Sequence, residues 1–248
     1  AERGWNAFPE SVGGKQCYNL LQQIEAKEID VKIERVWNNP WPSISVNYRN
    51  LTKVHFRAVR YDWLELIERT NYHPGSINRE LRGELLKRSP ALEWSHDLPA
   101  TEDYLPNEAR FEVPDNLQSG FYFLIASPNP AFRERDNRVL AREFFVSPLA
   151  LVLRTGSGHA LEGFVLNADT GQPIEGATVR PWIRKRVVRK QKWVEQENVR
   201  TNGDGQFRID GTARQSYVIL VEHDGYKIST HNAVRGDGRH GEPDAFNR

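Results

Sequence analysis

Residues 161–179 read LEGFVLNADTGQPIEGATV, a stretch in which two strand patterns flank one turn. Apolar residues are frequent over 160–167 and again from residue 177, so we predict a β-strand on each side. Asp169-Thr170-Gly171 between them has turn chemistry. Pro173 restricts φ and so fixes the backbone where the chain enters the second strand. These features predict the opening strands of a β-sandwich.

A second turn with the same chemistry lies in residues 201–209, TNGDGQFRI, where Asn202-Gly203-Asp204-Gly205 precedes a short strand. We expect Gly171 and Gly205 to adopt positive φ in their turns, because glycine has no Cβ. We also expect the Gly176-Ala177 pair to permit close packing between sheets.

The strand pattern continues on both sides of these turns and gives two sets of about seven strands. The run Phe121–Ala126 is apolar on both faces, which predicts a central strand covered on both sides. The first set is expected at 29–35, 44–48, 54–58, 92–98, 108–113, 120–127 and 138–147. The second is expected at 149–154, 160–167, 177–188, 192–201, 206–209, 216–221 and 226–230.

Two segments have helical spacing instead. Apolar residues at 17, 20, 21 and 24 form one helix face, and Gly13-Gly14 is expected to mark a helix boundary. This helix either packs on the following domain or ends a preceding one. Residues 62–88 are also helical in pattern, broken by His73-Pro74-Gly75, and are expected to form an insertion.

The predicted fold is mainly β, with two tandem antiparallel immunoglobulin-like or prealbumin-like β-sandwiches. The first carries the helical insertion and is preceded by the short N-terminal helix. Ser147-Pro148 marks the boundary between the sandwiches, and the charged, glycine-rich tail is expected to be a linker to a further domain. The expected division is 1–28 helical leader, 29–147 first sandwich, 148–234 second sandwich and 235–248 linker.

Composition excludes several classes of protein. The chain has 248 residues with 34 Lys and Arg against 33 Asp and Glu, so its net charge is +1 and a dedicated nucleic-acid binder is disfavoured. No window approaches the roughly 18 apolar residues of a membrane span. The one cysteine, Cys17, excludes an internal disulfide framework, and the lack of any Met leads us to expect a segment of a longer protein.

No pattern in the chain indicates catalysis or metal binding. The seven His are scattered without metal-ligand spacing, and Ser157 has neither a nucleophile elbow nor a base. Asn202-Gly203-Asp204-Gly205 lacks the ligands of a calcium loop. The carboxylate pairs Glu65/Glu68 and Glu195/Glu197 are best explained as solvated surface charge. We therefore predict no catalytic, cofactor-binding or metal-binding residues, and no cofactor.

Three further features bear on possible binding partners or modification. The basic run 184–192 is either a contact for an anionic partner or the outer part of a hairpin, balanced across the ladder by Glu195 and Glu197; the neutral total favours the second. The seven Trp are expected mostly in the core or between domains, with an exposed sugar-stacking platform as the alternative. Asn50-Leu51-Thr52 is a glycosylation sequon by pattern only.

Both halves of the chain resemble known families. Residues 161–179 and 201–209 resemble a carboxypeptidase-regulatory-like β-sandwich. Residues 42–62, 119–127 and 144–147 resemble an early macroglobulin domain of the large bacterial alpha-2-macroglobulin-like proteins, in which a regulatory-like sandwich follows such a domain. The resemblance covers roughly residues 30–232 and rests on the pattern of strands and turns.

The resemblance implies a non-enzymatic structural module of an envelope protein that traps endopeptidases, in the periplasm or cell envelope. A preceding segment could anchor the parent in the membrane. The implied partners are other domains of the parent and, through it, proteases, with no nucleic acid and no direct membrane span. Cys17 is not the thioester cysteine of that family, because Leu20 stands where a Gln is required. The alternative is a cell-surface sandwich pair that binds a glycan or a partner protein, and a third hypothesis is an accessory domain of an enzyme.

Overall fold

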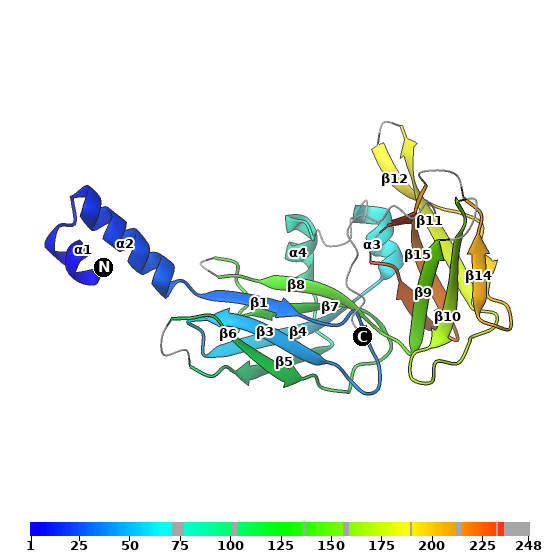
Figure 1. Cartoon of the computed structure of the whole chain (residues 1–248), viewed down its shortest axis with the longest axis horizontal. Coiled ribbons are helices and arrows are strands. Elements are labelled where there is room, and N and C mark those ends of the chain that lie inside the picture. The colour runs from blue at the N-terminus through cyan, green and yellow to red at the C-terminus, as the bar shows by residue number, and fades with distance from the viewer. Residues whose placement is uncertain are drawn as a thin grey trace.

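The computed structural model describes residues 1–70, 77–100, 104–135, 137–155, 159–188, 190–211, 215–231 and 233–235. Figure 1 shows two β-sandwiches side by side, with a pair of helices at one end of the molecule. The strands form antiparallel sheets apart from one short parallel pair. The predicted fold class is therefore confirmed. The predicted tail, 235–248, and the predicted helix break at 73–75 lie outside the described residues, except for Arg235.

The first sandwich packs a three-stranded sheet against a five-stranded one. The three-stranded sheet has the order β1-β3-β6, formed by β1 (Glu28–Lys32), β3 (Ser43–Arg49) and β6 (Asn107–Glu112). The larger sheet has the order β2-β8-β7-β4-β5, formed by β2 (Val36–Trp37), β8 (Leu140–Val146), β7 (Gly120–Ser127), β4 (Lys53–Tyr61) and β5 (Leu92–Asp97). Only β2, two residues long, runs parallel to its neighbour β8 within this described sheet.

The central strand β7 is apolar on both faces because both faces are covered. Alternate side chains of a strand point to opposite sides of the sheet. Tyr122, Leu124 and Ala126 belong to the core between the two sheets. Phe121, Phe123 and Ile125 belong to a second core on the outer face. The predicted central position of this strand is confirmed by its place between β4 and β8.

The helical insertion supplies the cover for that outer face. It consists of α3 (Trp63–Thr70) and α4 (Arg79–Leu85), whose apolar side chains join the outer core. Asp62 precedes α3 and its carboxylate accepts hydrogen bonds from the first-turn backbone, at 2.7 Å from Leu64 N. Asn78 caps α4 in the same way, at 2.8 Å from Leu81 N. Both caps are residue types that favour helix N-termini.

The second sandwich pairs a three-stranded sheet with a larger one. The first has the order β14-β10-β9, formed by β9 (Leu149–Thr155), β10 (Leu161–Asn167) and β14 (Gln206–Ile209). The second has the order β12-β11-β15-β16, formed by β11 (Thr178–Val187), β12 (Lys190–Glu195), β15 (Ser216–His223) and β16 (Tyr226–Ser229). Two short strands, β13 (Val199–Arg200) and β17 (Val234–Arg235), pair with β11 and β15.

Turn glycines of the second sandwich follow the prediction at two positions and depart from it at a third. Gly171 and Gly205 adopt φ of 71° and 69°, as expected. Gly176 was expected to allow close packing, and this is wrong, because a Cβ there would meet no heavy atom within 4 Å. Its φ of 72° explains the glycine instead, since an L side chain is strained in that conformation.

The N-terminal segment forms two helices, α1 (Glu2–Ala7) and α2 (Val12–Glu25), that project from the first sandwich (Figure 1). The expected boundary at Gly13-Gly14 is wrong, because α2 begins at Val12 with Ser11 as its cap. Gly14 is needed where the helices meet, since a Cβ there would lie 1.7 Å from the Phe8 carbonyl oxygen. Among the described residues, no helix is long and apolar enough to cross a membrane.

Candidate functional site: the joint between the two sandwiches

The two sandwiches share a buried core that neither could form alone. On β15, Tyr217, Ile219 and Val221 face the interior of the second sandwich. Val218 and Leu220, on the opposite face of β15, instead belong to the core that covers β7 and the helical insertion. All five are at most 4% exposed. The outer face of β15 is thus buried against the first sandwich.

Aromatic side chains form the centre of this joint. Trp63 of α3 meets Trp182 of β11, with ring centroids 6.3 Å apart and planes at 74°. Trp182 is 5% exposed and Trp193, on the adjacent strand β12, is 7% exposed. Edge-to-face pairs of this kind add to the hydrophobic gain of burying the rings. The helical insertion of the first sandwich therefore packs against β11 of the second sandwich.

A partly buried ion pair also connects the two sandwiches. The Glu143 carboxylate of β8, whose side chain is 10% exposed, accepts from Arg35 Nη2 at 3.1 Å. His231, which follows β16 in the second sandwich, has its Nδ1 atom 2.9 Å from the same carboxylate oxygen. Arg35 also donates to the Ser229 carbonyl at 3.5 Å. Glu143 thus has partners in both sandwiches.

The short strand β2 inserts one side chain into each sandwich. Trp37 is fully buried in the first core, where its ring stacks on Phe144 with centroids 3.8 Å apart. Its neighbour Val36 packs against the core of the second sandwich. Next along the chain, Asn38 donates to the Asp169 carboxylate at 2.9 Å. Three successive residues therefore connect the two units.

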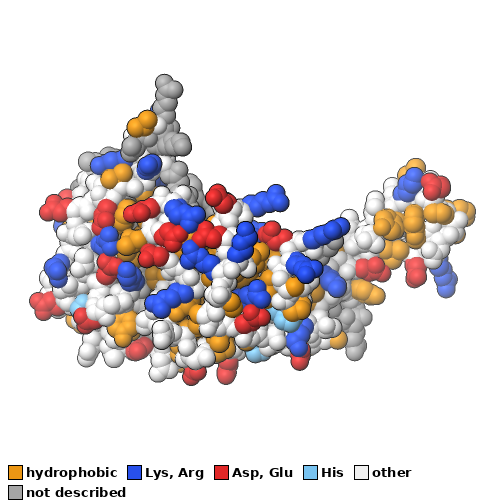
Figure 2. All heavy atoms as spheres, turned by 180° about the vertical axis from the view of Figure 1, so that it is seen from behind, with side chains coloured by type: hydrophobic (Ala, Val, Ile, Leu, Met, Phe, Trp, Pro, Cys, Tyr) orange, Lys and Arg blue, Asp and Glu red, His pale blue; other side chains and the backbone are white. Residues whose placement is uncertain are grey.

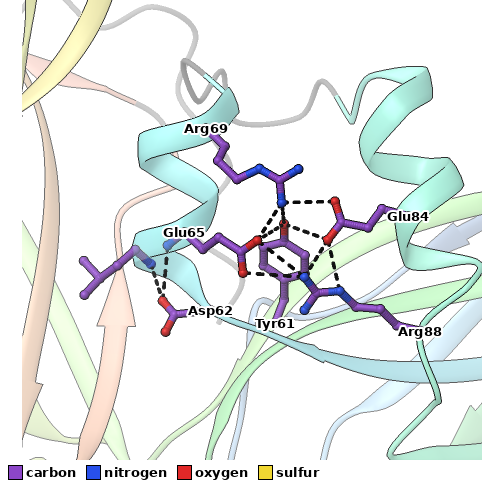
Figure 3. Close-up of polar contacts among 7 residues, drawn as sticks. Tyr61, Asp62, Glu65, Arg69, Glu84 and Arg88 are labelled. Carbon is purple, nitrogen blue, oxygen red and sulfur yellow. Dashed lines mark hydrogen bonds and ion pairs between the residues drawn. The ribbon is translucent and has the colours of Figure 1, made fainter.

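A polar network holds the helical insertion in place next to the joint (Figure 3). Tyr61 of β4 lies at its centre, with its hydroxyl 3.3 Å from Glu65 and 3.4 Å from Glu84. Arg69 bridges the two carboxylates, at 2.6 Å from Glu65 and 3.2 Å from Glu84. Arg88 lies over the Tyr61 ring at 4.1 Å from its centroid and donates to Glu84 through Nε at 3.1 Å. The network joins α3, α4 and β4.

The network changes the acidity of its members in opposite directions. Burial, reinforced by the nearby charges of Glu65 and Glu84, raises the pKa of Tyr61 to about 12. The hydrogen bond from Arg88 lowers the pKa of the Glu84 carboxyl below its usual range. Glu84 therefore remains charged and Tyr61 remains neutral over the physiological range. Such an arrangement supports structure, because no group is held ready to exchange a proton.

The carboxylates singled out from the sequence are not brought together as pairs. Glu65 is part of the network around Tyr61, whereas Glu68 of the same helix is exposed. Glu195 forms two hydrogen bonds with Arg180, at 2.6 and 2.9 Å, and Glu197 is exposed. Ser157 lies outside the described residues. Within the described ranges, no group of three His, Cys, Asp or Glu residues is placed to hold a metal ion.

The expected charge balance of the basic run is wrong. The hairpin register pairs Trp182 with Glu195, Arg184 with Trp193 and Lys185 with Lys192. Glu195 therefore lies beyond the basic residues and is bonded to Arg180. The two arms of the outer hairpin face each other without a carboxylate between them.

All seven tryptophans are buried or partly buried. Trp37, Trp63, Trp182 and Trp193 are buried, and Trp5, Trp41 and Trp94 are partly buried. This confirms the prediction of core and interdomain packing and leaves a sugar-stacking platform without an exposed Trp.

The Asn50 amide donates to the carbonyls of Ile24 and Ala26, at 2.7 and 3.0 Å, and so holds the end of α2. The predicted Asn202 turn is also found, with its side chain accepting from Gln206 N at 2.8 Å.

Sequence reasoning missed the joint and the residues that form it. One signal was present, because residues 217–221, YVILV, are apolar on both faces in the same way as β7. That pattern predicts a strand covered on both sides, although it does not identify the cover. The partners of Glu143, Arg35 and His231, come from segments far apart in sequence, and no local pattern indicates them.

Comparison with known proteins identifies a domain family in the second half of the chain and a similar fold over most of it. Residues 160–242 match the family model of the carboxypeptidase regulatory-like domain. No curated protein sequence matches the chain. Among solved structures, a segment of native alpha-2-macroglobulin from Escherichia coli spanning domains NIE-MG1 is similar with a TM-score of 0.57 at 13% identity, over 82% of this chain and 96% of that one.

A longer segment of the same E. coli protein, spanning domains MG0-NIE-MG1, has a TM-score of 0.59 at 14% identity. The alignment covers 82% of this chain and 64% of that segment, so the chain spans less than two thirds of its length. At this level of identity the similarity establishes the fold. The resemblance found in the sequence, to macroglobulin domains followed by a regulatory-like sandwich, is therefore confirmed.

Proposed function

We propose that this chain is a non-catalytic structural module of a large bacterial alpha-2-macroglobulin-like protein, one that traps endopeptidases. The buried joint is the observation that carries the proposal. Its aromatic core and the Glu143 ion pair fix two sandwiches against each other. The fold similarity to the NIE-MG1 segment supports it, because it extends over most of both chains.

A joint that holds two domains in one orientation is what the wall of a protease-trapping cage would require. Domains within a chain move relative to one another unless their interface is large and hydrophobic. Here the shared core includes Trp63, Trp182, Val218 and Leu220, all at most 5% exposed. We therefore infer that the two sandwiches behave as one rigid corner, which would preserve its shape when other parts of a trap rearrange.

The module is proposed to have no catalytic residues, cofactor or metal of its own. The two carboxylates of the Tyr61 network, Glu65 and Glu84, form ion pairs with Arg69 and Arg88. A general acid or base needs a group with a pKa near the working pH and access to substrate. The partners would be the other domains of the parent and, through them, the trapped protease, in the periplasm or cell envelope.

The test uses the intact parent protein. Its mass is recorded before and after treatment with methylamine, which opens thioesters, and again after a broad-specificity endoprotease is added. Protection of the bound protease from large inhibitors, while it still cleaves small substrates, is the expected result. Methylamine uptake and a covalent adduct would further identify a thioester trap. The same endoprotease with its nucleophile blocked is the control and should not be entrapped.

The outcome decides between two classes of function. If the parent takes up no methylamine and gives the protease no protection, the trapping proposal is wrong and recognition of a surface partner becomes the better account. A role for the joint is tested separately by Trp63→Ala in the parent. We expect this variant to lose protection of the protease, while the matched variant Trp5→Ala, outside the joint, retains it.

A further inference from the structure

The hairpin formed by the outer parts of β11 and β12 is strongly positive. Residues 184–192, RKRVVRKQK, contain six Lys or Arg and no Asp or Glu. Arg184, Lys185, Arg186 and Lys192 are exposed. The whole chain has a net charge of only +1, and on the face shown in Figure 2 basic and acidic side chains are interspersed over the sandwiches. The positive charge of the hairpin is therefore a local feature.

Cations lie on both faces of this hairpin. In a two-stranded ladder, residues in register share a face and neighbours alternate. Lys185 pairs with Lys192 on one face, and Arg186 pairs with Gln191 on the other. None of Lys185, Arg186 and Lys192 forms an ion pair with a residue of the described part of the chain. Like charges in register destabilise a hairpin, so the pattern is not explained by the stability of the ladder.

The turn of the hairpin exposes one apolar side chain. Val188 follows the paired residue Val187 and is 92% exposed. Its φ is 44°, a left-handed conformation that favours Asn or Gly and is uncommon for a β-branched residue. A strained, exposed Val at a turn costs stability in the free protein, which points to a role in contact with something else.

The base of the hairpin is anchored while its end projects. Trp182 and Trp193, one on each arm, are buried in the joint. Beyond them the hairpin extends past the rest of the second sandwich (Figure 1). The joint thus anchors the hairpin, while Val188 and the exposed cations of both arms lie away from the body of the protein.

We propose that Lys185, Arg186, Val188 and Lys192 of this hairpin form a docking element for a bilayer surface that carries anionic lipid headgroups. Lys and Arg would contact the phosphates, and Val188 would enter the boundary between headgroups and acyl chains. Peripheral proteins bind anionic bilayers through this combination of cations and exposed apolar side chains. A nucleic acid fits less well, because a ribbon that reads a groove presents polar side chains at the base edges, whereas the turn of this hairpin exposes Val188.

The test measures cosedimentation of the whole chain with vesicles. Vesicles of phosphatidylcholine are compared with vesicles containing about one third phosphatidylglycerol, at about 0.1 M salt, where charges act over about 10 Å. We expect binding to the anionic vesicles only, and weaker binding as salt is raised. Each cation near an anionic surface contributes about fivefold to affinity. The triple variant Lys185→Gln, Arg186→Gln, Lys192→Gln should therefore bind about 100-fold less tightly.

Two control variants keep the test specific. The triple variant Lys32→Gln, Lys87→Gln, Arg133→Gln removes the same charge from exposed positions elsewhere and should bind almost as tightly as the unchanged chain. Val188→Asn suits the φ of 44° and leaves the charge unchanged. It should preserve or improve folding but weaken vesicle binding several-fold through the lost apolar contact.

Three outcomes would overturn the proposal. These are no binding to anionic vesicles, equal losses in the two triple variants, and tighter binding to duplex DNA than to vesicles at the same salt. The last would assign the hairpin to nucleic acid. The result is independent of protease trapping, because the vesicle assay needs only this chain and no protease.

Discussion

The two connections of the first sandwich to its neighbours differ in kind. Towards the second sandwich it contributes to a shared aromatic core around Trp63 and Trp182. Towards the helical pair α1–α2 it contributes hydrogen bonds to the end of α2, from Arg49 to Gln23 O and from Asn50 to Ile24 O. No residue before Ile29 belongs to the three hydrophobic cores of the described chain.

The difference teaches which parts of the molecule fold and move together. Burial of apolar surface ties two units into one cooperative body, whereas a few hydrogen bonds at the surface exchange easily with water. We therefore expect the two sandwiches to unfold together. We expect α1 and α2, which bury only Gly14, to open at lower free energy.

The largest expected effect comes from the joint. Trp63→Ala should lower the free energy of unfolding by about 3–5 kcal/mol, as for other buried aromatic residues. Trp5→Ala, in α1, should leave the global transition almost unchanged. Urea denaturation followed by tryptophan fluorescence measures both. Equal losses in the two variants would contradict the distinction between a core joint and a peripheral attachment.

The Tyr61 network should make stability depend on pH. The folded pKa of about 12 lies above the ordinary 10.0, so the folded chain keeps a proton that the unfolded chain releases between these values. Its contribution is complete below pH 10 and is lost as pH rises through 12, amounting to about 3 kcal/mol. Denaturation at a series of pH values measures this decline. Tyr61→Phe should remove that part of the decline, and an unchanged slope in this variant would contradict the assignment.

Glu143 tests the polar part of the joint. Glu143→Gln removes the charge that faces Arg35 and His231, at a side chain only 10% exposed. We expect a loss of about 1.5–3 kcal/mol, typical of hydrogen bonds to charged groups. Glu93→Gln is the matched control, because its partner Arg57 is also an arginine but its own side chain is 48% exposed. The control should lose at most about 1 kcal/mol, so a larger loss there than at Glu143 would argue against a special role of the joint.

The smallest effect is expected at the attachment of the helical pair. Asn50→Gly removes two hydrogen bonds to α2 and retains the positive φ of 55°. Amide hydrogen exchange in α2 should become faster while the global transition shifts by no more than about 1 kcal/mol. Asn50→Ala should accelerate the same amides and also reduce global stability, because Ala is strained at that φ. Unchanged exchange in α2 would show that Asn50 does not hold the helix.

Local patterns in the sequence predicted the strands and the insertion well. β7 is found at 120–127, as predicted, because a run of apolar residues on both faces has few other solutions. The Asn202 turn and the positive φ of Gly171 and Gly205 follow from chemistry within a few residues. Two glycine predictions were wrong, at Gly14 and Gly176, since a glycine can serve a close contact or a turn and the sequence does not distinguish them.

The functional interpretation depended more on tertiary contacts. The basic run was predicted to be balanced by Glu195 and Glu197, but the register places the Glu195 carboxylate three pairs further from the turn than Lys192, where Arg180 binds it. Glu143 and His231 are 88 positions apart and meet only in the folded chain. Pairings over such distances are set by the packing of whole sheets.

The sequence by itself determined that this chain forms two β-sandwiches with a helical insertion, because alternation and turn chemistry act between near neighbours. Only the tertiary structure decided that the insertion joins the sandwiches, that Tyr61 stays protonated beside two carboxylates, and that Glu195 lies away from Lys185 and Lys192 in the hairpin register. These depend on which faces meet, and burial at a contact is a property of both surfaces together.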